Sequence, residues 1–85
     1  MNNDIKIGDW IKIKTEKNSI GIDGYVFYIH DNNILSIGYY QNNSIAIKED
    51  VIWDLEGFWK FKHKGPNGLY LKGKEKKIVE RGPYV

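Results

Sequence analysis

Apolar and polar residues alternate along much of this chain, and this two-residue period predicts β-strands. Residues 5–14 and 58–64 show the pattern most clearly, with isoleucine or aromatic side chains in one phase and lysines in the other. Successive side chains of a strand point to opposite faces of its sheet. Both segments are therefore expected to form half-buried strands that expose their lysines.

Short polar segments divide the rest of the chain at regular intervals. Two asparagine pairs and two glycine-containing segments favour tight turns, because Asn and Gly tolerate the left-handed backbone conformation. They lie at residues 32–33, 42–43, 21–24 and 65–68. Further strands are expected between these turns, at residues 25–30, 34–40 and 45–47. Residues 51–53, between two acidic clusters, are expected to be irregular or to form a single helical turn.

The C-terminal residues, 66–85, are expected to form one more β-hairpin. Apolar residues at 69–71 and 77–79 flank a polar turn at 73–76. Two short apolar segments on either side of a turn are typical of paired antiparallel strands.

The strands at residues 25–30 and 34–40 carry large apolar side chains in both phases. Such a pattern is typical of strands that are covered on both faces. The C-terminal hairpin is the expected cover. The alternative is that Tyr28 and Tyr40 stay exposed as a binding surface.

Five short strands joined by tight turns, opening with the segment Gly8-Asp9-Trp10-Ile11-Lys12-Ile13, resemble a small barrel of the Src-homology-3 (SH3) type. The resemblance covers about residues 5–64. It implies an all-β, SH3-like five-stranded barrel, on which residues 66–85 pack as an extra C-terminal β-hairpin. The chain is also similar to uncharacterised small proteins of bacterial genomes and mobile elements that share this barrel. This likeness implies no catalytic residue.

The composition fits a single domain spanning residues 1–85. Isoleucine occurs thirteen times, aromatic residues twelve times and alanine once, a bias that favours sheet over helix. The chain has no cysteine, which excludes a disulfide framework and a thiolate metal site. It shows neither a signal-peptide pattern nor an apolar segment of bilayer length. A cytoplasmic protein without membrane contact is therefore expected, and its Ile, Lys and Asn content is typical of low-GC bacteria or their phages.

Catalytic and metal chemistry find little support, so we expect no enzyme, cofactor, metal or small-molecule substrate. A Ser-His-Asp site would need His30 or His63 with one of three serines, and the strand-turn-helix context of such nucleophiles is missing. Two histidines in separate elements do not make a zinc site without further ligands. Asp31 opens a segment similar to the start of a calcium loop, but the glycine and final glutamate of such loops are missing.

Charge is distributed unevenly along the chain. Residues 1–59 hold five basic and nine acidic side chains, a net charge of −4, whereas residues 60–85 hold eight basic and two acidic ones, a net charge of +6. This division predicts a basic surface beside an acidic one, which bears on binding partners more than the overall charge of +2 does.

The lysines of the first and fifth strands are expected to share one outer face, because these strands are neighbours in a barrel of this type. Lysines neutralise phosphates and aromatic rings stack on bases, the combination that single-strand nucleic-acid binders use. A non-catalytic nucleic-acid-binding module is therefore the first functional prediction. Its expected contacts are Trp10, Lys12, Lys14, Phe58, Lys60, Lys62 and Lys64, extended by Lys72, Lys74 and Arg81 near the C-terminus.

A protein-interaction module is the second functional prediction, for example a phage- or mobile-element-encoded inhibitor of a host protein. Small size, rigid turns and exposed aromatic residues suit this role. Its expected contacts are Tyr28, Tyr40, Glu49, Asp50, Asp54 and Glu56. In a third interpretation the lysines bind no ligand, because lysine on an exposed strand also prevents aggregation between strand edges.

Overall fold

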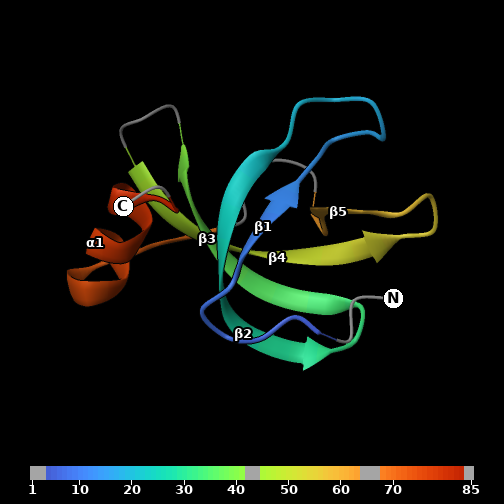
Figure 1. The fold of residues 1–85 in the computed structure, drawn as a ribbon. Helices are drawn as coiled ribbons and strands as arrows, with labels where there is room; N and C mark the ends of the chain where they lie inside the picture. Colours follow the sequence, from blue (N-terminus) through green and yellow to red (C-terminus); the bar gives the residue numbers. More distant parts are fainter. Residues whose placement is uncertain (1–3, 42–44, 64–67, 84–85) are drawn as a thin grey trace.

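The computed structural model describes residues 4–41, 45–63 and 68–83 as a mainly β structure with one short helix (Figure 1). The strands are β1 (Trp10–Ile13), β2 (Ile22–Asp31), β3 (Ile34–Gln41), β4 (Ile45–Asp54), β5 (Phe58–Phe61) and β6 (Leu69–Tyr70), and the helix is α1 (Gly73–Arg81). Within these described ranges, no helix is long and apolar enough to cross a membrane.

The first five strands close into a barrel because β5 returns to lie beside β1. Strands β1 to β5 pair in chain order as antiparallel neighbours. β5 then runs parallel to β1 with Ile13 opposite Trp59, and the Lys14 backbone N–H donates a 2.8 Å hydrogen bond to the Trp59 carbonyl. The predicted all-β, SH3-like five-stranded barrel is confirmed, and so is the predicted contact between its first and fifth strands.

Every strand of the ring contributes to the core inside the barrel. In chain order, the central residues are Ile13, Val26, Leu35, Ile37, Val51 and Trp59. Each is at most 4% exposed. Trp53 packs edge-to-face against Trp59, with 5.2 Å between the ring centroids. Burial of apolar surface is worth roughly 25 cal/mol per Å², so this cluster is a major source of stability.

Strand β4 continues through residues 51–53, so the predicted irregular segment or helical turn is wrong. Val51 is fully buried and pairs with Phe61 of β5. The acidic residues Asp50 and Asp54, which suggested a break, lie in the opposite phase of the strand. Their carboxylates contact polar side chains on the outer face, and they therefore do not interrupt the strand.

A β-bulge in β2 interrupts the strict alternation of its side chains. The register of β2 with β3 shifts between Val26 and Tyr28, as expected where one strand accommodates an extra residue. As a result, Val26 and Ile29 both pack in the barrel core although they are three residues apart. Phe27, between them, packs in a separate cluster on the outer face.

The C-terminal residues form a short strand and a helix, so the predicted hairpin over residues 66–85 is wrong. β6 pairs with β4 outside the barrel ring, and α1 follows it. Lysine and glutamate, which dominate this segment, are strong helix formers, and Lys76 forms a 3.6 Å ion pair with Glu80 one turn later. Gly82 ends the helix with a φ of 78° and donates its N–H to the Ile78 carbonyl.

The helix covers the outer face of β3 and β4 and builds a second apolar cluster there. This cluster consists of Ala46, Leu71 and Val79, with Tyr25, Phe27 and Tyr40 packed around them. Gly38 of β3 lies beneath the helix, where a Cβ would overlap the Phe27 ring and lie 2.8 Å from Val79. The predicted cover over the strands at residues 25–30 and 34–40 is found in part: a helix, not a hairpin, lies over β3 and β4, and β2 contributes Tyr25 and Phe27 to the cluster beneath it. Of the two tyrosines in the alternative prediction, Tyr28 is exposed, whereas Tyr40 is partly buried against this cluster.

Replacing Gly38 with alanine should destabilise the protein, because the new methyl group has no room between sheet and helix. Overpacking typically costs about 1–3 kcal/mol, and urea denaturation followed by tryptophan fluorescence should show a fall of this size in the free energy of unfolding. Lys74→Ala, at an exposed position of α1, should change it by less than about 0.5 kcal/mol. Wild-type stability of Gly38→Ala would contradict this helix–sheet packing.

Candidate functional site

Lysines on and next to β1 and β5 line a groove on the outside of the barrel. This groove, which we call the basic groove, has a volume of about 580 Å³ and is lined by Lys14, Thr15, Ile52, Lys60, Phe61, Lys62 and His63. Lys14 also lines an adjoining groove, together with Lys12. Four of the lysines named from the sequence therefore lie along one wall of the barrel.

Two of these four lysines are held by carboxylates. Lys12 Nζ lies 2.8 Å from Asp23 Oδ1, and Lys60 Nζ lies 2.9 Å from Asp54 Oδ1. The hydrogen bond from Lys60 is the main reason why the pKa of Asp54 is below its ordinary value. Both pairs are partly exposed, and exposed ion pairs contribute little to stability because water screens them.

Of the three lysines that line the basic groove, Lys14 and Lys62 are available to a ligand, whereas Lys60 is paired with Asp54. Neither Lys14 nor Lys62 forms an ion pair with any residue in the described ranges. Lys62 is exposed and Lys14 partly so. Their ammonium groups are therefore available to an anionic ligand, for which they would supply charge-assisted hydrogen bonds.

The two aromatic residues predicted beside these lysines do not form an exposed stacking surface. Phe58 is only 9% exposed and lines the adjoining groove with Ile5 and Ile11, so its predicted outward exposure is wrong. Trp10 is half-buried and packs edge-to-face against Tyr25, with 5.3 Å between the ring centroids. The alternation of residues predicts on which face of the sheet a side chain lies, but it does not predict which neighbouring segments cover that face.

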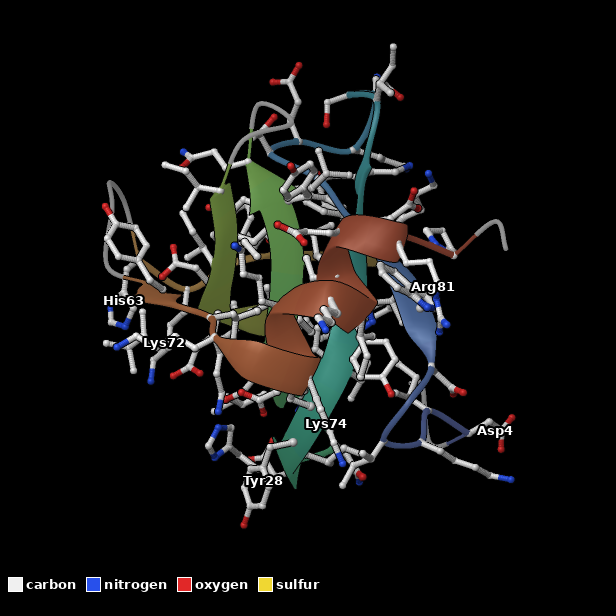
Figure 2. All side chains as sticks on the ribbon, turned by 90° about the vertical axis from the view of Figure 1, so that its left-hand side faces the viewer. Asp4, Tyr28, His63, Lys72, Lys74 and Arg81 are labelled. Carbon is white, nitrogen blue, oxygen red and sulfur yellow. The ribbon has the colours of Figure 1, made fainter. Side chains whose placement is uncertain are left out.

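The C-terminal cations do not extend the basic groove, contrary to the sequence prediction. Lys74 and Arg81 belong to α1, and Figure 2 shows both on the helix that faces the viewer. Figure 1 places α1 and β5 on opposite sides of the barrel. Lys72 lies between β6 and α1 and is not a lining residue of the groove. Lys64 lies outside the described residues.

The six residues predicted for protein binding do not form one surface. Tyr28 is 54% exposed on β2, but Tyr40 is packed beneath α1. Glu49 is only 7% exposed, because its phase in β4 points into the barrel. The other three, Asp50, Asp54 and Glu56, lie on the outer phase of β4 and in the turn that follows it.

Ser36, His30 and Asp50 come together on the outer face of the sheet. The Ser36 hydroxyl donates to Asp50 Oδ1 at 2.7 Å, and Ser36 Oγ lies 2.8 Å from His30 Nε2. Since the hydroxyl proton is directed at the carboxylate, Nε2 is the donor of the second hydrogen bond. The three side chains form a polar link between β2, β3 and β4.

A second cavity opens at one end of the barrel, and the sequence analysis did not identify it. This mouth cavity has a volume of about 600 Å³ and is lined by Tyr39, Gln41, Ile47, Glu49, Phe61, His63, Gly68 and Tyr70. The residues come from the end of β3, the start of β4, the end of β5 and the β6 segment. Unlike the basic groove, the mouth cavity is lined by a buried carboxylate, that of Glu49.

The mouth cavity combines that carboxylate with aromatic rings. Tyr39 and Phe61 are in contact, with 5.2 Å between ring centroids and a 53° angle between the rings. Burial raises the pKa of Tyr39, and the negative charge of Glu49 raises it further. Glu49 and Tyr39 both line the cavity, so the carboxylate and the phenol lie near each other.

The sequence contained a signal for the inward position of Glu49. Ile47, Glu49 and Val51 occupy one phase of β4, and both flanking residues are buried. Grouping Glu49 with the adjacent Asp50 as one solvated acidic cluster concealed the fact that the two carboxylates lie on opposite faces. Within the described ranges, no group of three or more His, Cys, Asp or Glu residues is placed to hold a metal ion.

Replacing Glu49 with glutamine should lower the pKa of Tyr39 without returning it to its ordinary value. The substitution removes the negative charge but leaves the burial of the phenol, which is the larger cause. Ultraviolet absorbance titration of the wild type and the variant measures the shift, and Tyr39→Phe identifies the signal. Glu56→Gln, at an exposed position, should leave the pKa unchanged. An unshifted Tyr39 in Glu49→Gln would contradict the geometry of the mouth cavity.

Comparisons of the chain with protein-family models, with curated proteins and with solved structures return no match.

Proposed function

We propose that this protein is a non-catalytic module that binds a nucleic-acid strand through its phosphates, which contact the basic groove. The convergence of Lys14, Lys60 and Lys62 on one groove supports the proposal. Lysines that neutralise phosphates supply most of the affinity in sequence-independent nucleic-acid binding. Contact with the phosphate backbone also needs no exposed stacking platform, in agreement with the buried ring of Phe58.

Backbone hydrogen bonds to other strands of the barrel fix the positions of Lys14 and Lys62. The Lys14 N–H donates to the Trp59 carbonyl at 2.8 Å, and the Lys62 N–H donates to the Asp50 carbonyl at 3.0 Å. Only side-chain freedom is then lost when a phosphate binds, which limits the entropy cost of association.

Lys60 can join these two lysines when a phosphate is present. Its side chain is 39% exposed in the pair with Asp54, and exposed pairs of this kind contribute little to stability because water screens them. A phosphate oxygen can therefore replace the carboxylate at little cost. The overall net charge of +2 adds a weak longer-range attraction for a polyanion.

The double substitution Lys14→Glu/Lys62→Glu should weaken binding of a fluorescein-labelled oligothymidine by at least about tenfold, because it removes two phosphate contacts and adds repulsion. Fluorescence anisotropy titration measures the dissociation constant. For three phosphate contacts, the wild-type affinity should fall with salt with a log–log slope of about −2, and the slope should be smaller in the variant.

Lys74→Glu/Lys77→Glu is the matched control, because it changes the net charge by the same amount at exposed positions of α1. It should retain most of the wild-type affinity. Equal losses in the two double variants would show a general charge effect and would contradict a site in the basic groove. Circular dichroism confirms that both variants keep the barrel.

A further inference from the structure

We propose that an unstacked base of the bound strand enters the adjoining groove beside the basic groove, and that the ligand is therefore single-stranded. The adjoining groove has a volume of about 400 Å³ and is lined by Ile5, Ile11, Lys12, Lys14, Trp53, Gly57, Phe58 and Trp59. The inference rests on the proposed function and deepens it, because phosphate contacts alone occur with single strands and duplexes alike.

Lys14 connects the two grooves. It lines both of them, and its backbone N–H donates a 2.8 Å hydrogen bond to the carbonyl of Trp59, another lining residue of the adjoining groove. In a nucleotide the sugar joins the base to the phosphate. A strand whose phosphate contacts Lys14 therefore carries a base within reach of the adjoining groove.

The lining of the adjoining groove offers aromatic contacts that suit a base. Trp53 of β4 is partly exposed, whereas Phe58 and Trp59 are only 9% and 4% exposed, so Trp53 is the most accessible of the three rings. Its edge-to-face contact with Trp59, with 5.2 Å between the ring centroids, holds the ring in place before a ligand arrives. Aromatic side chains bind single-stranded nucleic acids by stacking on bases of any sequence.

The charge of the adjoining groove favours a ligand that carries phosphates. Its described lining residues include two lysines and no acidic residue. Lys12 is paired with Asp23 at 2.8 Å, but Lys14 forms no ion pair with any described residue. An apolar side chain of a partner protein would contact the rings without using this charge, whereas a base joined to a phosphate uses both.

The proposal favours a single strand over a duplex. Bases in a duplex are stacked and paired, and moving one of them out costs more free energy than moving a base that is already single-stranded. The protein should therefore bind a single strand at least as tightly as a duplex of the same length, although the duplex carries more phosphates.

An oligomer without bases separates base contact from phosphate contact. Fluorescence anisotropy titrations of the wild type compare fluorescein-labelled oligothymidine with an abasic oligomer of the same length, in which a tetrahydrofuran residue replaces each nucleoside. The abasic oligomer keeps every phosphate and should bind at least about fivefold more weakly, because the stacking of a base is lost. The salt dependence of the two affinities should be the same, since the phosphate contacts are the same.

Trp53→Leu tests the residue on which the inference rests. It should lower the affinity for oligothymidine to about that of the abasic oligomer and leave binding of the abasic oligomer unchanged. Trp10→Leu is the matched control, because Trp10 is also a partly buried tryptophan but lines neither groove. The indole N–H resonance of Trp53 in the wild type should shift with oligothymidine and not with the abasic oligomer, a measurement that needs no stable variant.

Equal binding of the two oligomers, tighter binding of the duplex, or an unshifted Trp53 indole would overturn the inference. None of these results contradicts phosphate binding in the basic groove, so the proposed function would stand. Absence of binding to either oligomer would overturn both proposals.

Discussion

The contact between β1 and β5 is the constraint on which the rest of the molecule depends. Ile13 lies opposite Trp59, both side chains are buried in the core, and the hydrogen bond from Lys14 to the Trp59 carbonyl joins the two strands. This closure seals the barrel interior and brings Lys14 beside Lys60. Strand β5 then contributes to two sites, since Lys60 lines the basic groove and Phe61 lines both this groove and the mouth cavity.

The period of the side chains located five strands, because each strand has one face in the core, and the resemblance to the SH3 type implied that they close into a barrel. Residues 21–24, which were expected to form a turn, lie mostly within β2, where Gly24 pairs with Ile11 of β1. The same period could not predict the bulge after Val26, since an inserted residue depends on pairing with β3. It also failed over α1. There, β-branched residues near Val79 suggested a strand, but Lys and Glu favoured a helix and the outer face of β3 and β4 offered a surface for it to cover.

The same reasoning placed the lysines of the basic groove on one wall but misjudged which residues around them are accessible. Phe58 has the outward phase and is still buried, because neighbouring segments cover it. Glu49 was grouped with Asp50 by sequence proximity, although adjacent residues of a strand lie on opposite faces. The alternation of β4 places Glu49 in the same phase as Ile47 and Val51, against the expectation that charged residues are solvated.

The distance along the chain between Ile13 and Trp59 has a consequence for synthesis. A nascent polypeptide that has emerged only through β4 can form its antiparallel ladder, but it still lacks the tryptophan that completes the interior. Pairings between residues far apart in sequence also form slowly, because the loop entropy is lost before the contact is gained. On the ribosome, the apolar faces of the early strands therefore remain open until translation has passed β5, and the β6–α1 segment can settle on a finished barrel afterwards.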